Sequence, residues 1–326
     1  MAESTQEKKQ GVSLVLSSGG ARGVAHIAVI EELERRGYQI NSIAGSSIGA
    51  VIGGVYACGS LQDYKDWVSG LSKLDVWRLL DFSLSIQGFI RGERVFRAME
   101  EFITDCNIED LPIDYAAIAT DLHNKREYVF RKGSLFQAMR ASVAIPTVMQ
   151  PVQYNGLTLL DGGVLNPMPI NCVNRQPGDL LVVSNVSAAI PCEEIDIPKG
   201  DKVLKVESDE DDEEGNNFFG PQFEQVKQKL LSLFPSSEDE QEIKKETKKK
   251  LGFLDLMSES IDLMQDKITS MVLENYQPEV TVSISKDAAS TFEFNRADEL
   301  LHRGRKAINE ALDAWEEKNK ESSPAN

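Results

Sequence analysis

The first sixty residues alternate between short apolar runs and apolar residues at helical spacing. Residues 12–17, VSLVLS, are mostly branched and apolar and lead into glycines, which predicts a buried strand. Residues 24–36 place apolar side chains at helical spacing and stop at Gly37, so they predict a helix. The same two signals recur over 40–44 and 48–58. This order of strand, helix, strand, helix indicates a parallel sheet with helices on both faces.

The same patterns continue to the end of the chain. Helical spacing covers residues 61–80, 93–103, 134–142, 251–276 and 297–315. Strands are predicted over 115–120, 127–130, 180–187 and 280–284, and another short apolar strand ends at Asp161. The apolar stripe of 251–276 fits burial in the core and equally a contact between two copies, so the pattern assigns no oligomeric state.

A charged stretch interrupts this pattern after residue 187. Residues 207–217, ESDEDDEEGNN, form a like-charge block that packs poorly. The segment 218–235 that follows is amphipathic, which fits a lid, a helix that touches a membrane, or a helix packed on its own domain. We therefore divide the chain into regions: a disordered tail (1–10), a core (11–187), a charged insertion that is partly disordered or a lid (188–250), a helix-strand-helix unit that completes the core (251–318) and a second disordered tail (319–326).

Composition and charge narrow the class of partner. The formal net charge of −17 argues against nucleic acid, because phosphate binding needs clustered Lys and Arg. Four cysteines are far apart in the sequence and form no C-x-x-C, which indicates reduced thiols rather than a zinc site or a disulfide framework: Cys58, Cys106, Cys172 and Cys192. The acidic block lacks the order of an EF-hand loop. The N-terminus has no apolar signal-peptide core, and no segment has the ~18 apolar residues of a membrane span. We expect a soluble cytoplasmic protein without metal or cofactor.

One motif lies where a predicted strand gives way to a predicted helix. Gly45-Ser46-Ser47-Ile48-Gly49 fits G-x-S-x-G, in which a serine sits on a sharp turn with its hydroxyl exposed and small neighbours relieve crowding. A serine hydroxyl is a weak nucleophile at neutral pH. It needs a base within hydrogen-bond reach and donors aimed at the oxyanion that forms.

A glycine-rich loop after the first strand offers such donors. Residues 18–23, SGGARG, lead into a helix, so backbone N–H groups and the helix terminus favour an anion there. The main alternative is a phosphate cradle, but the loop lacks the G-K-[ST] of a P-loop and does not match G-x-G-x-x-G. Arg22 fits either a substrate phosphate or carboxylate, or a structural acid.

The choice of base lies between histidine and aspartate. His302 is in the position that the Ser-Asp-His order of α/β-hydrolases requires, but it lies inside a helix pattern with charged neighbours. His26 and His123 have no better setting. Asp161 ends a short strand and is followed by Gly162 and Gly163, and a carboxylate in a dry pocket can act as base directly. The alternative for Asp161 is an ordinary Asp-Gly turn.

Four motifs in the same order resemble the patatin-like phospholipases, and most closely their small bacterial single-domain branch. They are SGGARG at 18–23, GSSIG at 45–49, ASVAIP at 141–146 and DGG at 161–163. The resemblance covers residues 12–186 well and the chain after residue 251 more loosely. One departure is Ser18, because the family's usual triple glycine is here Ser18-Gly19-Gly20.

The resemblance implies a three-layer α/β/α sandwich with a mainly parallel central sheet, and a Ser-Asp dyad without a cofactor. The dyad falls on Ser47 and Asp161. The oxyanion loop falls on Gly19, Gly20, Ala21, Arg22 and Gly23, the nucleophile turn on Gly45 and Gly49, and the DGG motif on Gly162 and Gly163.

The implied activity is hydrolysis of fatty-acyl esters of phospholipids or lysophospholipids, with transient contact to a membrane surface. A general carboxylesterase or thioesterase is one alternative. A non-catalytic binding protein that uses the acidic block as its contact surface is another, although the intact Ser47 and Asp161 argue against it.

Overall fold

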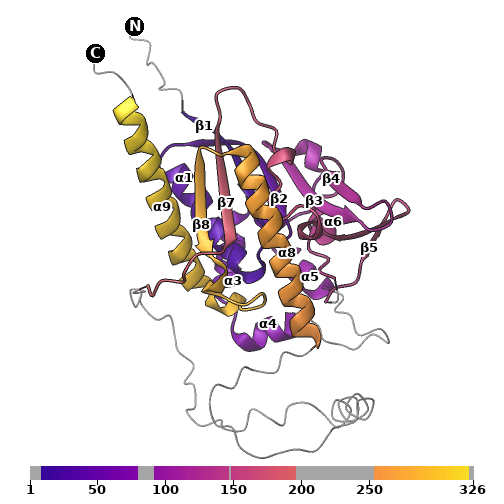
Figure 1. The fold of residues 1–326 in the computed structure, drawn as a ribbon. Coiled ribbons are helices and arrows are strands. Elements are labelled where there is room, and N and C mark those ends of the chain that lie inside the picture. Colours follow the sequence, from indigo (N-terminus) through magenta and orange to yellow (C-terminus); the bar gives the residue numbers. More distant parts are fainter. Residues whose placement is uncertain (1–8, 80–91, 147, 196–252, 323–326) are drawn as a thin grey trace, which may run out of the picture. The chain divides into compact units, whose positions relative to one another are not determined.

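An eight-stranded sheet runs through the centre of the structure, a computed structural model (Figure 1). The strands lie in the order β5-β6-β3-β2-β1-β7-β8, and β4 pairs with β3. Their bounds are β1 Gly11–Leu16, β2 Gln39–Ser46, β3 Asp114–Asp121, β4 Arg126–Phe130, β5 Val152–Tyr154, β6 Leu157–Asp161, β7 Leu180–Ala188 and β8 Val280–Ser285. The pairs from β3 through β8 along this order are parallel, whereas β4, β5 and β6 join by antiparallel pairing.

The structure describes residues 9–79, 92–146, 148–195 and 253–322. These residues belong to one compact unit. The predicted N-terminal tail up to residue 8, the acidic block, the amphipathic segment 218–235 and the last four residues lie outside the described residues.

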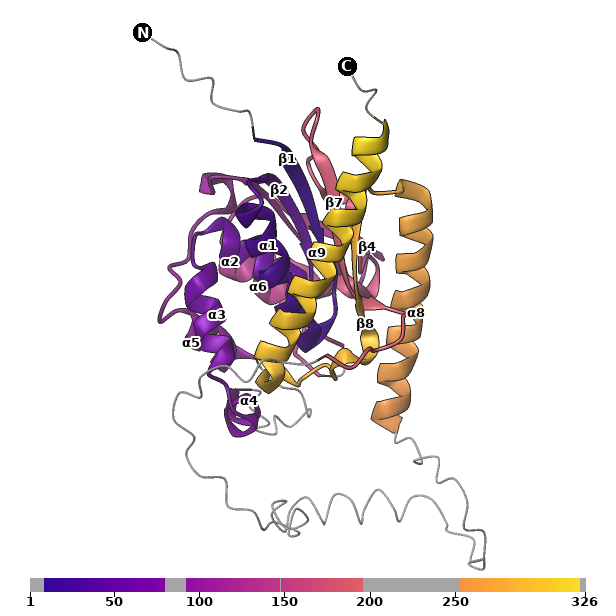
Figure 2. The same ribbon diagram turned by 90° about the vertical axis from the view of Figure 1, so that its left-hand side faces the viewer.

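Helices cover both faces of the sheet (Figure 2). One face carries α1 Ala25–Arg35, α2 Ile48–Ala57, α6 Leu135–Ser142 and α9 Ala297–Ser322, and the other carries α8 Phe253–Tyr276. The helices α3 Leu61–Ser69, α4 Lys73–Leu79 and α5 Glu93–Met99 follow α2 in the chain. Short 3-10 turns complete the fold: η1 Gly20–Val24, η2 Ile108–Asp110, η3 Gly162–Val164, η4 Ile170–Cys172, η5 Lys286–Ala288 and η6 Phe294–Arg296. The predicted α/β class with a mostly parallel sheet is confirmed.

Both faces of the central strands are buried, which explains their nearly continuous apolar sequences. Leu14 and Leu16 of β1 belong to the large core beneath α1, α2 and α9. Val15, between them, belongs to a smaller core that includes Val183 of β7 and is packed by Val272 of α8. Successive side chains of a strand point to opposite faces, so one strand supplies both cores.

Strand β3 is shared by three partners on two edges. One part of β3, Ala117 and Ile118, pairs with β2 on one side and with β4 on the other. The next part, residues 119–121, pairs with β6 and β4. Each residue of a strand pairs with at most one strand on each side. Because β4 occupies one side of β3, β2 and β6 must pair one after the other along the opposite side. β2 ends at Ser46 opposite Ile118, and the next position, Ala119, is opposite Asp161 of β6.

Several predicted element bounds were wrong. The stretch predicted as one helix over 61–80 forms two helices within its described residues, 61–79, because Gly70 ends α3 and a capping box starts α4. In that box Ser72 N donates to Asp75 Oδ2 (3.1 Å) and Asp75 N donates to Ser72 Oγ (3.2 Å). The helix predicted over 93–103 stops at Met99, and strand β5 was not predicted. α9 continues to Ser322, so residues 319–322 are helical rather than part of a disordered tail.

Helix α2 passes directly over the end of β1 at Gly49. A Cβ atom added there would lie 2.3 Å from the carbonyl oxygen of Leu16, which is backbone and has little room to move. We predict that Gly49→Ala lowers the free energy of unfolding by about 3 kcal/mol, as overpacking does in well-packed cores. Urea denaturation measures this loss. The matched control is Gly70→Ala, whose Cβ would lie 3.5 Å from its nearest neighbours; equal effects of the two substitutions would contradict the prediction.

Candidate active site

Ser47 occupies the single residue between β2 and α2. Its backbone has φ 55° and ψ −125°, a strained conformation for a residue with a side chain. A Cβ atom on Gly45 would lie 2.4 Å from the carbonyl carbon and oxygen of Gly49. Close packing therefore leaves no room for a side chain at either glycine of the G-x-S-x-G pattern.

Ser142 holds the strained backbone of Ser47. The Ser47 N–H donates to Ser142 Oγ (2.9 Å), and Ser142 Oγ donates in turn to the carbonyl of Ile118 in β3 (2.5 Å). Ser142 is completely buried at the end of α6. Ser142 lies within the ASVAIP motif, but no local pattern in the sequence indicates that it would bond the backbone of Ser47.

Asp161 is brought to Ser47 by the end of β6. Ser47 Oγ donates to Asp161 Oδ2 at 2.6 Å, and the N–H of Gly163 donates to Asp161 Oδ1 at 2.7 Å. Thr120 Oγ1 donates to the carbonyl of Asp161 at 2.9 Å, which fixes the backbone. A Cβ atom on Gly162 would lie 2.2 Å from the Ile118 carbonyl, so the DGG motif lets β6 approach β3 closely.

Burial decides the protonation of Asp161. The residue is 5% exposed, and this desolvation raises the pKa of its carboxyl from 3.8 to about 6. Hydrogen bonds from Ser47 and Gly163 act in the opposite direction but are weaker in sum. Near neutral pH the carboxylate is thus ionised yet close to its pKa, which suits a group that accepts and returns a proton.

The glycine-rich loop supplies two open backbone donors. Within the described residues, no acceptor is bonded to the N–H groups of Gly19 and Gly20, and both residues line a cavity that includes Ser47. The N–H of Ala21 donates to the carbonyl of Thr291 at 2.8 Å, so the prediction that it faces the oxyanion was wrong. The sequence of the loop does not reveal this hydrogen bond, because the acceptor, Thr291, lies far away along the chain.

Arg22 and Gly23, the last two residues of the loop, serve its packing. Arg22 is 7% exposed and donates through Nε to the carbonyl of Gly19 (2.9 Å) and through Nη1 to the carbonyl of Lys286 (2.8 Å). It therefore ties the loop to the turn after β8, and neither of its two predicted partners, a substrate anion or a structural acid, takes these bonds. A Cβ atom on Gly23 would collide with the side chain of Ile48, so this glycine gives room to α2.

None of the three histidines lies at Ser47. His26 is buried, with Nδ1 2.8 Å from Ser184 Oγ and Nε2 3.0 Å from the carbonyl of Ser17. The carbonyl can only accept, so Nε2 carries the proton. Burial lowers the pKa of His26 to about 4, which keeps the ring neutral. His123 and His302 are absent from the described lining of the cavities that contain Ser47.

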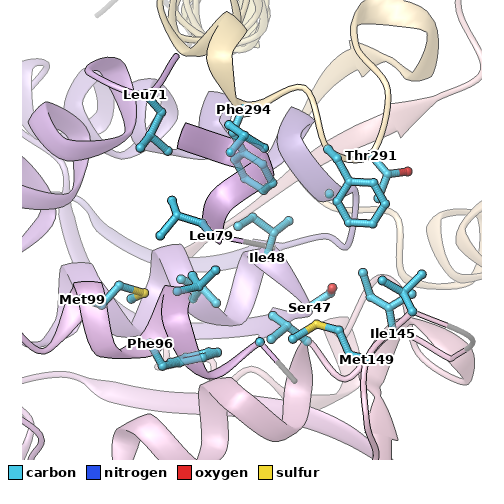
Figure 3. Close-up of a pocket in the computed structure, with 18 of the residues that line it drawn as sticks. Ser47, Ile48, Leu71, Leu79, Phe96, Met99, Ile145, Met149, Thr291 and Phe294 are labelled. Atoms are coloured by element: carbon cyan, nitrogen blue, oxygen red, sulfur yellow. The ribbon is translucent and has the colours of Figure 1, made fainter. Parts of the chain in front are cut away.

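Two cavities meet at Ser47. The first is apolar and lined by residues from α2, α3, α4, α5 and the segments near 145 and 292; Figure 3 shows Ser47 at one side of it, with Leu79, Phe96 and Met99 in its wall. The second is called the polar cavity here because Gly19, Gly20, Arg22, Asp161 and Gln265 of α8 line part of it, although apolar side chains such as Val164 and Ile261 also belong to its wall. Ser18 Oγ donates to Gln265 Oε1 at 3.2 Å, so α8 closes this polar side.

The described residues contain no cluster of three or more His, Cys, Asp or Glu side chains that could hold a metal ion. In the same part of the chain, none of the helices has the length and apolar character needed to cross a membrane. All four cysteines are free thiols.

Fold and site together define an α/β protein with a serine on a strand-to-helix turn that bonds a buried carboxylate. The family model described as patatin-like phospholipase matches residues 14–172. An NTE family protein of Mycobacterium tuberculosis is 33% identical over 96% of this chain and 94% of its own length, and a counterpart from Mycobacterium bovis matches equally. This chain belongs to the NTE family and carries its patatin-like phospholipase domain, which confirms the predicted resemblance.

Two further relatives match with different coverage. Lysophospholipase NTE1 of Candida albicans is 33% identical over 51% of this chain and 12% of its own length. The crystal structure of VipD from Legionella pneumophila aligns over 94% of this chain and 67% of that chain, with a TM-score of 0.46 and 13% sequence identity.

The buried carboxylate has a consequence for stability. The pKa of Asp161 is about 6 in the folded protein and near 3.8 when exposed, so folding favours its protonated form. Well below pH 3.8 the carboxyl is protonated in both states, whereas above about pH 6 the folded protein must hold the charge. We predict that Asp161→Asn stabilises the protein by up to about 3 kcal/mol at pH 8 and by much less at pH 4.5. Urea unfolding at both pH values measures the difference, and a gain that does not grow with pH would contradict it.

Proposed function

We propose that this chain is a serine hydrolase that cleaves fatty-acyl esters of phospholipids or lysophospholipids with Ser47 as nucleophile and Asp161 as base. The observation that carries the proposal is the 2.6 Å hydrogen bond from Ser47 Oγ to Asp161 Oδ2 at the junction of an apolar and a polar cavity. The name of the Candida albicans relative, a lysophospholipase, supports the class of substrate.

In the proposed acylation step, Ser47 Oγ attacks the acyl carbonyl carbon as its proton passes to Asp161 Oδ2. The carbonyl oxygen becomes an oxyanion, which the N–H groups of Gly19 and Gly20 stabilise as hydrogen-bond donors. Collapse of the tetrahedral intermediate breaks the ester bond, and Asp161 returns the proton to the leaving alcohol. Ser47 is then esterified with the fatty acid, and Asp161 is again a carboxylate.

Deacylation uses the same groups in the same order. Asp161 accepts a proton from a water molecule while the water oxygen attacks the acyl carbon, and the loop of Gly19 and Gly20 again holds the oxyanion. Collapse releases the fatty acid and gives the proton back to Ser47 Oγ. No histidine takes part, in agreement with the positions of His26 and His302.

The two cavities suggest how the substrate lies. An acyl chain fits the apolar cavity, because its walls are aliphatic and aromatic side chains such as Phe96 and Met99. The glycerol and headgroup side of the ester fits the polar cavity beside Gln265 and Asp262. This division favours a lipid ester over the alternative of a general carboxylesterase or thioesterase.

The dyad is tested by hydrolysis of a medium-chain p-nitrophenyl ester. We predict that Ser47→Ala and Asp161→Asn each lower kcat by about a thousandfold or more, since the nucleophile and its base act as a unit. His302→Ala should retain wild-type kcat, and circular dichroism of all variants checks their folding. A loss of activity in His302→Ala equal to that of Asp161→Asn would refute the dyad. Wild-type protein without turnover would favour the binding-protein alternative.

The apolar cavity is tested by the length of the acyl chain. We predict that kcat/KM rises about tenfold or more from butyrate to octanoate esters, because each added methylene group is buried against apolar walls. Leu71→Trp should fill the outer part of the cavity, to which Leu71 contributes. This variant should lose activity on the long ester and keep it on the short one. A flat dependence on chain length in the wild type would instead identify a general esterase.

A further inference from the structure

Helix α4 has two apolar sides with different surroundings. Val76 and Leu79 line the apolar cavity that reaches Ser47. Leu74 and Trp77, also three residues apart, are 54% and 55% exposed. Side chains at this spacing lie on the same side of a helix. Leu74 and Trp77 therefore form an apolar surface, the α4 ridge, on a helix that also supplies the cavity wall.

The position of the ridge relates it to the site. In both views α4 and the first turns of α8 lie at the end of the sheet where β1 and β8 finish (Figures 1 and 2). Ser47 follows β2, which is parallel to β1, so it lies toward this same end. Leu256, in the first turn of α8, is 56% exposed there as well.

Basic residues outnumber acidic ones on α4 and α5, in contrast to the whole chain. Among the described residues of these two helices, Lys73, Arg78, Arg94 and Arg97 are basic and Asp75 and Glu93 are acidic, whereas the full chain has a formal net charge of −17. Lys73 and Arg78 flank the ridge on α4, and Arg97 is exposed on α5. Arg94 Nη1 of α5 donates to the backbone carbonyl of Arg78 (3.3 Å), so the two helices lie together.

We propose that the α4 ridge and the basic residues around it dock on the surface of an anionic phospholipid bilayer. Tryptophan favours the headgroup region of a bilayer, and lysine and arginine are attracted to anionic headgroups. A bilayer at this surface would lie beside the helix whose inner side lines the cavity, so an acyl chain has a short apolar path to Ser47. The inference rests on the proposed function, because the bilayer supplies the ester.

Vesicle binding by full-length Ser47→Ala tests the docking surface without turnover. The probes are vesicles of phosphatidylcholine alone and of phosphatidylcholine mixed with phosphatidylglycerol in equal parts. We expect cosedimentation with the mixed vesicles only, weakened by added salt. Adding Leu74→Gln and Trp77→Gln should lower the partition coefficient about tenfold. Adding Lys73→Gln instead should lower it about fivefold, as expected for one charge at an anionic surface.

The matched control is Tyr276→Gln, which removes a similarly exposed aromatic side chain (48%, against 55% for Trp77) at the far end of α8. Equal vesicle binding by this control and the ridge variant, or no binding by Ser47→Ala, would overturn the proposal. So would a dimer in solution that only the ridge substitutions dissociate, since the ridge would then join two copies.

Hydrolysis of a soluble medium-chain ester separates this proposal from the proposed function. The Leu74→Gln, Trp77→Gln variant of the otherwise wild-type chain should keep that activity and lose hydrolysis of phospholipid in mixed vesicles. Ester hydrolysis without vesicle binding would reject the docking surface alone. Vesicle binding without ester hydrolysis in the wild type would reject the proposed function and support the docking surface.

Discussion

The shared edge of β3 is the constraint on which the site depends. Strand β2 ends opposite Ile118, and β6 continues along the same edge with Asp161 opposite Ala119. Ser47 and Asp161 are 114 residues apart in sequence, and backbone pairing alone brings them to adjacent positions. Serine and aspartate side chains are short, so a shift of β6 by one residue would point the carboxylate to the other face of the sheet.

The C-terminal part of the chain fixes the loop that faces Ser47. Thr291 accepts a hydrogen bond from Ala21, Lys286 accepts one from Arg22, and Gln265 of α8 accepts one from Ser18. Each contact joins the loop at residues 18–23 to a segment more than 240 residues later. The loop that presents Gly19 and Gly20 is thus positioned by tertiary contacts as well as by its own glycines.

These contacts also explain what could be predicted from the sequence. Gly45, Ser47 and Gly49 were predictable because all three lie within one five-residue pattern, although Gly49 is close-packed against Leu16 of β1, and Asp161 was predictable because glycines follow it directly. The N–H of Ala21 donates to the carbonyl of Thr291 and is therefore not available to an oxyanion. No local pattern reveals a hydrogen bond to so distant a carbonyl. The role of Ser142 is equally hidden from local patterns, since its partners are Ser47, after β2, and Ile118 of β3. The break between α3 and α4 was different: Ser72 and Asp75 formed a readable capping box that the apolar periodicity of 61–80 obscured.

Two unfavourable features meet in the resting site, and the proposed chemistry relieves one of them. Ser47 has a strained backbone held by Ser142, and Asp161 carries a desolvated charge held by Ser47 and Gly163. When Ser47 attacks an ester, its proton neutralises the buried carboxylate and the negative charge moves to the oxyanion. That charge then faces the open N–H groups of Gly19 and Gly20. Because burial disfavours the ionised carboxylate, the same burial that lowers the stability of the folded protein favours the proton transfer.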